Sequence, residues 1–193
     1  MKKKIIYIAI LLICLSLITG GTYAYYTAEA TARNVITTGG ISVRVVEQEM
    51  VNGVLQPYPS QPIKIMPATK VSKIVSVQSE AQAAWIRMNF TLTVYDPQGE
   101  VMDIPAEELN SAILIQTDSE NWTLKDSWWY YDTAIQGGHV TSPLFREVVF
   151  SGTHMDNKYQ GCTLEILVNV QGVQQANNGT SVTEALGWPE DET

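Results

Sequence analysis

The sequence predicts an all-β protein: an antiparallel β-sandwich of jelly-roll-like type with one or two short helices. Within Trp85–Tyr95, apolar and polar residues alternate from Ile86 to Val94, and the apolar positions of Leu164–Val170 repeat the same two-residue period. A two-residue period puts one set of side chains on a buried face and the other in water, which is typical of an antiparallel sheet with one wet side. Turn residues separate such stretches, so many short strands are expected.

The chain opens with a predicted secretory signal peptide, residues 1–24. Three lysines precede an apolar run from Ile5 to Thr19, and Thr22 and Ala24 are small enough for a signal peptidase groove, so cleavage is expected before Tyr25. As a helix, the apolar run would reach roughly 22 Å, short of the ~30 Å hydrocarbon core of a membrane. We therefore expect a secreted protein, with membrane attachment only in the unprocessed precursor.

Composition limits the partners of the mature chain. Loss of residues 1–24 removes Lys2, Lys3 and Lys4 and changes the formal net charge from −8 to −11. Such an acidic protein is repelled by phosphates, so no nucleic acid partner is expected. Cys162 is the one cysteine left, which excludes an intramolecular disulfide. The core of a single domain must supply the stability.

Residues 25–39 are predicted to be an amino-terminal donor-type strand. Its apolar face is narrow, which suits a strand that enters a tight groove, and its members are Tyr26, Ala28, Ala30, Ala32 and Ile36. Once cleavage frees its end, such a strand can pair with its own sheet or with the exposed edge of another subunit. The alternatives are an ordinary first strand and a loose tether.

Residues 40–188 are predicted to form one sandwich domain, followed by an acidic tail, residues 189–193. The further strands expected in this domain cover residues 41–46, 71–77, 113–116, 128–131 and 144–150. One short helix is expected from about Asp103, with Pro105 in its first turn. Another is expected after Ser181, whose spacing to Glu184 matches a capping box.

Five aromatic residues within ten positions are candidates for an adhesive or carbohydrate-binding surface. They are Trp122, Trp128, Trp129, Tyr130 and Tyr131. Exposed on a sandwich face, such rings stack on sugars or enter a partner, whereas buried rings belong to a core.

Two histidines, His139 and His154, are weak candidates for a metal site. A catalytic zinc ion takes three protein ligands, and the sequence has no His-Glu-x-x-His motif, so Glu147 or Asp156 would have to complete the set. Cys162 has no assignable histidine partner for nucleophilic catalysis. We expect no catalytic residues, no cofactor and no metal.

Three stretches resemble the TasA/CalY/camelysin family. Gly20-Gly21-Thr22-Tyr23-Ala24, an aromatic start and then residues 34–41 are similar to the family's opening. Residues 67–77 with Trp85-Ile86-Arg87 resemble its proline-led strand pair, and residues 157–161 with 164–170 and 173–177 resemble its closing strand. Ala68 stands where members often have glycine. Residues 103–140 resemble nothing in the family, and the role of Cys162 is open.

The resemblance implies an exported protein of a Gram-positive cell, processed by a SipW-type signal peptidase. It implies a jelly-roll subunit of a biofilm-matrix fibre, in which the amino-terminal strand of one copy fills a groove in the next. Neighbouring copies and possible accessory matrix proteins are the expected partners. A camelysin-like cell-surface metallo-endopeptidase and a secreted adhesive module are the alternatives.

Overall fold

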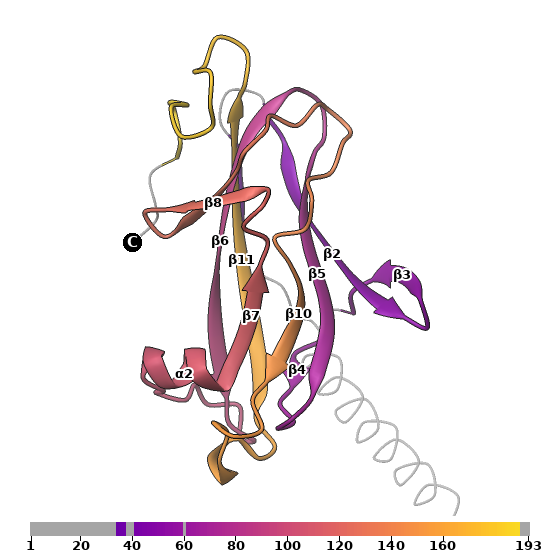
Figure 1. The fold of residues 1–193 in the computed structure, drawn as a ribbon, viewed down its shortest axis with the longest axis vertical. Helices are drawn as coiled ribbons and strands as arrows, with labels where there is room; N and C mark the ends of the chain where they lie inside the picture. Colours follow the sequence, from indigo (N-terminus) through magenta and orange to yellow (C-terminus); the bar gives the residue numbers. More distant parts are fainter. Residues whose placement is uncertain (1–33, 38–40, 60, 190–193) are drawn as a thin grey trace, which may run out of the picture. The chain divides into compact units, whose positions relative to one another are not determined.

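The computed structural model describes residues 34–37, 41–59 and 61–189, all within the compact unit that spans residues 33–193 (Figure 1). The predicted leader, its cleavage site at Thr22, Ala24 and Tyr25, and most of the acidic tail lie outside the described residues. Among the described residues, no helix is long and apolar enough to span a bilayer.

Two sheets form the fold. Sheet A has the order β1-β11-β6-β9-β8, with β4 also on β11, and sheet B has the order β3-β2-β5-β10-β7. The strands of sheet A are β1 (Asn34–Thr37), β4 (Ile63–Lys64), β6 (Ala84–Tyr95), β8 (Trp122–Lys125), β9 (Trp128–Tyr131) and β11 (Thr163–Gln174). Those of sheet B are β2 (Val43–Val51), β3 (Val54–Pro57), β5 (Lys70–Ser79), β7 (Ile113–Thr117) and β10 (Phe145–Phe150). All pairs are antiparallel except β1 with β11.

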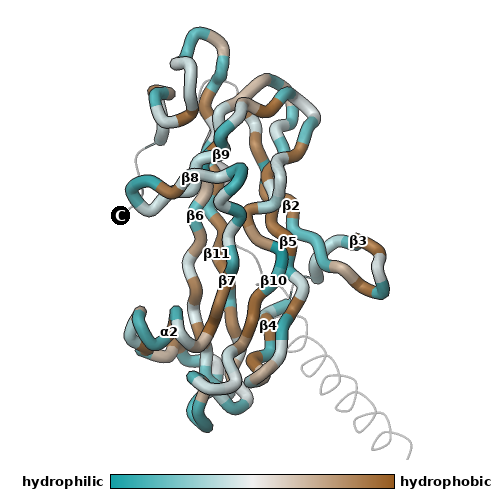
Figure 2. The backbone as a smooth tube through the Cα atoms, viewed as in Figure 1, coloured by the Kyte–Doolittle hydropathy of each residue, from teal (hydrophilic) through white to brown (hydrophobic). Residues whose placement is uncertain are grey.

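The core lies between the sheets, where their apolar faces meet. Hydrophobic residues recur along the strands of both sheets in Figure 2. Phe90 of β6 packs edge-on against Phe145 of β10, with ring centroids 5.2 Å apart. A Cβ on Gly172 of β11 would lie 2.7 Å from Val43 Cγ1 of β2, so only glycine allows this approach. The prediction of an all-β sandwich is confirmed.

The longest pair is β6 with β11, which are in register over the full length of both strands. These are the stretches whose alternation is clearest in the sequence. Ile166, Val168 and Val170 of β11 belong to the core, whereas the residues between them lie on the other face of sheet A. The side-chain period therefore predicted the buried face correctly.

One of the two predicted helices forms. Helix α2 (Ala106–Ala112) begins after Pro105. The segment after Ser181 is a turn rather than a helix, so that prediction is wrong. Gly187 has a φ of 80°, which a right-handed helix cannot include, and it follows Ser181 by only a few residues. The segment between them is too short for the several turns that a stable helix needs.

A hairpin that the sequence reading missed joins β2 to β3 and projects from the sandwich (Figure 1). Asn52 and Gly53 form its turn with φ values of 51° and 80°, as a type I′ turn requires. The Asn-Gly dipeptide between Val51 and Val54 is the signal that predicts such a turn.

Candidate assembly edge and the other predicted site residues

One edge of β11 is only partly covered. β4 pairs with Thr163–Leu164 and β1 with Asn169–Gly172, both on the side away from β6. Between them lie residues 165–168, which have no strand partner on this edge among the residues that the structure describes. We call these four residues the open interval of β11.

The open interval has an apolar side and a polar side. Ile166 and Val168 are each 6% exposed and belong to the core. Glu165, on the opposite face, accepts a hydrogen bond of 2.7 Å from the hydroxyl of Tyr95. A strand that pairs here should therefore alternate small apolar residues with polar ones.

β1 lies parallel to β11, next to the open interval. Its register puts Asn34 at the position of Asn169, Val35 at that of Val170 and Ile36 at that of Gln171. This edge of β11 therefore accepts a strand from the amino-terminal part of the chain. Of the predicted donor residues, Ile36 lies in β1, whereas Tyr26, Ala28, Ala30 and Ala32 fall outside the described residues.

One acceptor atom beside this pair, the side-chain oxygen of Asn169, has no donor among the described residues. The side-chain amide of Asn169 donates to Asn89 Oδ1 across the pair of β11 with β6, at 3.0 Å. Asn169 Oδ1 is buried and accepts no hydrogen bond from the residues that the structure describes. A buried unsatisfied acceptor costs about 1–3 kcal/mol, so a donor is expected to approach it.

A buried ion pair lies where the β2–β3 hairpin leaves the sandwich. Lys73 Nζ of β5 is 2.8 Å from Glu47 Oε1 of β2 and 3.9 Å from the ring centroid of Tyr58. Lys73 is 5% exposed. Burial, with the charges of Glu49 and Glu47 adding to it, raises the pKa of Tyr58 to about 12. The sequence reading missed this cluster because its residues come from β2, β5 and the segment after β3, which are separate parts of the chain.

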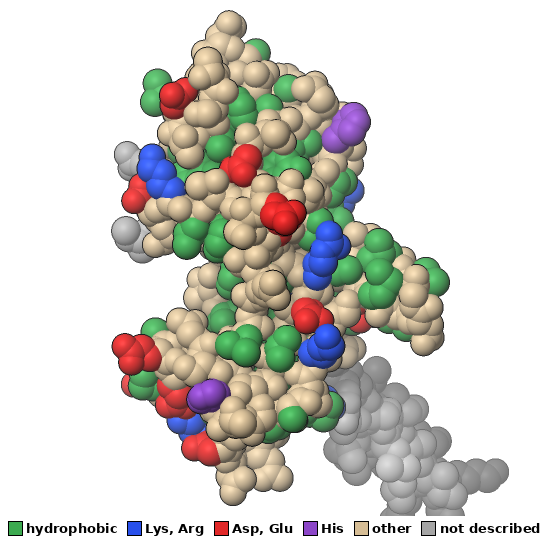
Figure 3. Space-filling model, in the orientation of Figure 1, with side chains coloured by type: hydrophobic (Ala, Val, Ile, Leu, Met, Phe, Trp, Pro, Cys, Tyr) green, Lys and Arg blue, Asp and Glu red, His purple; other side chains and the backbone are tan. Residues whose placement is uncertain are grey.

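The two histidines lie in separate exposed loops, and histidine side chains form separate patches on the face seen in Figure 3. His139 Nδ1 lies 3.2 Å from the carbonyl oxygen of Gly137. His154 Nδ1 lies 3.1 Å from both Ser151 Oγ and Thr153 Oγ1. In the part of the chain that the structure describes, no three His, Cys, Asp or Glu side chains come together as metal ligands. Among the described residues, His139 and His154 therefore do not join other such side chains in a three-ligand site.

The five clustered aromatic residues are not exposed. Trp122 lies in the main core, Trp128 and Tyr130 lie in a second core cluster, and Trp129 and Tyr131 pack partly buried against the main core.

Arg87 organises the second cluster. Its guanidinium lies over the rings of Trp128 and Trp188 and donates to the Pro189 carbonyl, which fixes the carboxy-terminal segment against the outer face of sheet A. Packing against this segment accounts for the burial of Trp128 and Tyr130.

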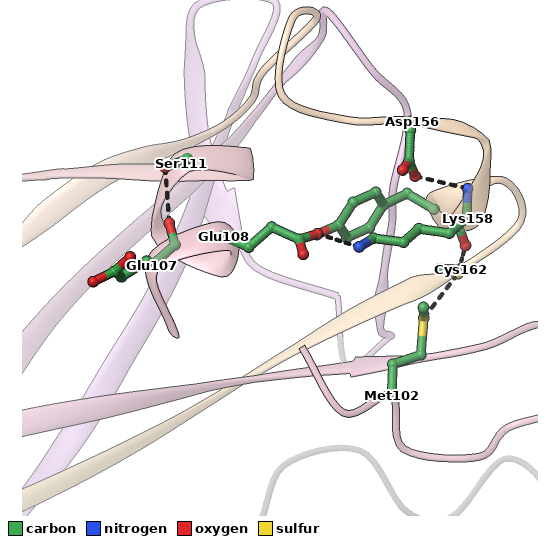
Figure 4. A network of polar contacts seen from close by, with 8 residues as sticks. Met102, Glu107, Glu108, Ser111, Asp156, Lys158 and Cys162 are labelled. Carbon is green, nitrogen blue, oxygen red and sulfur yellow. Dashed lines mark hydrogen bonds and ion pairs between the residues drawn. The ribbon is translucent and has the colours of Figure 1, made fainter. Parts of the chain in front are cut away.

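The region from Asp103 to Val140 adds α2, β7, β8 and β9 to the sandwich. Glu108 fixes α2, because it accepts a 2.7 Å hydrogen bond from Tyr159 Oη and pairs with Lys158. Figure 4 shows the side chains of Glu108 and Lys158 pointing toward each other. The hydrogen bond from Lys158, followed by that from Tyr159, lowers the pKa of Glu108. This cluster ties α2 to the turn before β11.

Cys162 is a free, buried cysteine next to that turn. Its Sγ is 3.4 Å from Met102 Sδ and 3.3 Å from the Lys158 carbonyl oxygen. Burial raises the pKa of its thiol, which disfavours the reactive thiolate. It also lines an open cavity of about 750 Å³ between β4 and the segment 155–163.

Comparison with known protein families gives a match to the first part of the chain. The model of a family described as camelysin metallo-endopeptidase matches residues 1–60, from the predicted leader through the β2–β3 hairpin. No curated protein and no solved structure matches the chain. The resemblance of this chain to the TasA/CalY/camelysin family is thereby confirmed, through its first 60 residues.

Proposed function

We propose that this chain is a secreted, self-assembling structural protein of the extracellular matrix. Its subunits join when the processed amino-terminal strand of one copy pairs with the β11 edge of another. The observation that carries the proposal is the open interval of β11, which adjoins the position of β1 and is backed by buried Ile166 and Val168. A strand leading into β1 would run along this interval.

Exchange between copies reuses a contact that the single chain already makes. β1 pairs with its own β11, and the sequence has Gly39-Gly40 between β1 and the next described residue, Ile41. Donation to a neighbour keeps the β1–β11 pairing and changes only which molecule supplies the strand. Because donor and acceptor lie on different parts of the chain, the contact does not close on itself and propagates a filament.

The balance between the two pairings sets a condition for assembly. A strand on a short flexible linker has an effective concentration in the millimolar range, so at micromolar protein the self-paired form has an advantage of about 4 kcal/mol. Filaments therefore need a trans pairing that is longer or less strained than the pairing in one chain. Residues 25–33 are the segment that can supply the difference.

Deletion of residues 25–34 from the mature protein tests the proposal. The deleted chain should remain folded, because the core uses residues from Ile41 onward, but it should not polymerise. Circular dichroism reports the fold and negative-stain electron microscopy reports the filaments. Deletion of residues 190–193 is the matched control and should leave filaments unchanged. Normal filaments from the chain without residues 25–34 would falsify the proposal.

Processing and location belong to the same proposal. The leader would be removed by a signal peptidase of SipW type, and accessory matrix proteins are possible further partners. The mature chain would act at the cell surface or in the matrix around a Gram-positive cell. Mass spectrometry of the secreted protein checks this, since the mature chain should begin at Tyr25.

A second candidate function, metallo-endopeptidase, rests on the name of the matching family. If it applies, zinc should copurify with the chain, and replacement of both His139 and His154 by alanine should remove it. Elemental analysis of the two proteins separates this candidate from the structural role.

A further inference from the structure

The dipeptide Asn-Gly occurs twice in the sequence, and the structure puts its two copies in different surroundings. Asn52-Gly53 forms the turn between β2 and β3, and both residues are exposed. Asn178-Gly179 lies in the segment after β11, where Asn178 is half-buried. An asparagine side chain can react with the main-chain nitrogen of the next residue, and glycine exposes that nitrogen most because it has no side chain.

Both reacting groups are accessible at Asn52-Gly53. Among the described residues, the side chain of Asn52 has no hydrogen-bond partner. In a type I′ turn the cross-strand hydrogen bond is donated by the residue after the turn, here Val54, so the N–H of Gly53 stays free. A Cβ on Gly53 would meet no described atom within 4 Å, so open space surrounds this residue.

At the second copy, hydrogen bonds hold the side chain of Asn178. Its amide donates to the Gln174 carbonyl at 2.9 Å and to the Leu186 carbonyl at 3.0 Å. Its Oδ1 accepts a 2.8 Å bond from the N–H of Leu186. The carbonyl oxygen of Asn178 accepts a further bond, of 2.8 Å, from Trp85 Nε1. A turn of the Asn178 side chain towards the nitrogen of Gly179 therefore has to break the bonds of its amide group.

We propose that Asn52 is a site of spontaneous deamidation through a succinimide, and that the fold protects Asn178 from the same reaction. The nitrogen of Gly53 gives up its proton and forms a bond to Cγ of Asn52, the Cγ–Nδ2 bond breaks, and ammonia leaves with that proton. Water then opens the ring at either of its carbonyl carbons. One opening yields aspartate, and the other yields isoaspartate, in which the main chain runs through Cγ.

The reaction needs a brief opening of each turn, and the two openings differ in cost. β3 is exposed along its whole length, so opening the tip of the hairpin breaks few apolar contacts. Opening around Asn178 breaks side-chain hydrogen bonds worth about 1 kcal/mol each, or about fivefold in population for each bond. Asn52 should therefore react at least about tenfold faster than Asn178 in the folded protein.

Either product changes the hairpin tip. A carboxylate is added among the exposed apolar side chains of Met50, Val51, Val54 and Leu55. Isoaspartate also lengthens the main chain between Val51 and Val54, which pair across the two-residue turn. A type I′ turn depends on that loop length, so the isoaspartate form should lose the pairing at the tip.

Peptide mapping by mass spectrometry tests the reaction. The purified protein is held at mildly alkaline pH, and the exchange of NH2 for OH is followed in the peptides that contain Asn52 and Asn178. Asn52 should convert at least about tenfold faster in the folded protein, and the two rates should agree within about twofold in urea, where neither asparagine has its native contacts. Equal rates in the folded protein, a difference that persists in urea, or a folded protein in which Asn52 does not convert would overturn the proposal.

The variant Asn52→Asp is the matched control for the effect on the hairpin, because it has the added charge but an ordinary main chain. Amide hydrogen exchange of residues 51–55 should show protection lowered about fivefold or more in the separated isoaspartate form, and changed less than about twofold in Asn52→Asp. Equal loss in both would overturn the assignment of the effect to the lengthened main chain. These measurements need no filaments, so they stand or fall apart from the proposed function.

Discussion

Sheet A has an open edge at β11 and sheet B has one at β3. The two edges differ in the side chains that pack beneath them. The open interval of β11 is backed by Ile166 and Val168, which are buried in the core. β3, at the edge of sheet B, is exposed along its whole length and belongs to a hairpin that projects from the sandwich (Figures 1 and 3). A strand added to β11 extends the core, whereas one added to β3 gains little buried area.

The main chain of β3 is also less available. Tyr58 N–H donates to the Glu47 carbonyl of β2, so Tyr58 directs its main-chain groups toward β2. Successive residues of an antiparallel strand alternate between facing the partner strand and facing away from it. Leu55 and Pro57 therefore direct their main-chain groups away from β2, toward the open edge. Pro57 has no N–H to donate, which blunts the edge. Exposed side chains at the tip, Met50, Val51, Val54 and Leu55, still give it an apolar surface. An unpaired edge therefore becomes a docking edge only when donors, acceptors and a buried apolar face coincide.

The largest change in unfolding free energy is expected at the buried ion pair of Lys73 and Glu47, where the β2–β3 hairpin leaves the sandwich. Lys73→Ala leaves Glu47 without its partner in a mostly buried position, which should cost about 3–5 kcal/mol of unfolding free energy. The double variant Glu47→Gln/Lys73→Met should recover most of the loss, because no charge remains buried. Urea denaturation measures both. A loss below about 1 kcal/mol for Lys73→Ala would mean that water already screens the pair.

The second effect contrasts the two edges directly. Ile166→Ala removes a buried side chain behind the open interval and should cost about 2–4 kcal/mol. Leu55→Ala, at a residue that is 50% exposed on β3, is the matched control and should stay within about 0.5 kcal/mol. Urea denaturation at equal protein concentration compares them. Similar losses would show that the hairpin packs against something in solution.

The third prediction concerns Pro57, which leaves the outer edge of β3 without one main-chain N–H donor. Pro57→Val restores an outward N–H on β3, so this strand gains a second residue that can pair with another chain. Self-association should rise with protein concentration, while the unfolding free energy changes by less than about 0.5 kcal/mol. Analytical ultracentrifugation distinguishes the variant from the wild type. If the variant stays as monomeric as the wild type, the hairpin shape rather than the proline keeps this edge unpaired.

The sequence predicted structure well where the pattern depends on neighbouring residues, and it failed where a residue's contacts come from a distant part of the chain. The alternation in Trp85–Tyr95 identified β6 because a two-residue period reports a buried face directly. The outer-face arginine of that strand, Arg87, is buried by a segment about 100 residues away, which no local pattern shows. The register of β1 on β11 is likewise a tertiary fact. The β2–β3 turn, in contrast, was readable from Asn52-Gly53 and was overlooked.

The smallest effect concerns the loop that carries β4, the strand that ends the open interval. Ala68 follows Pro67 and has a φ of 59°, a conformation that favours glycine. Ala68→Gly removes a left-handed strain of roughly 1–2 kcal/mol but adds freedom to the unfolded chain, so a net gain of about 0.5 kcal/mol is expected. Ala68 is exposed, and its Cβ lies 2.9 Å from the position that a Cβ on Gly152 would take, so its removal leaves no void in the core. Thermal unfolding should show a slightly higher midpoint. A lower midpoint would mean that the alanine methyl contributes packing that outweighs the backbone strain, and that β4 is held by this contact.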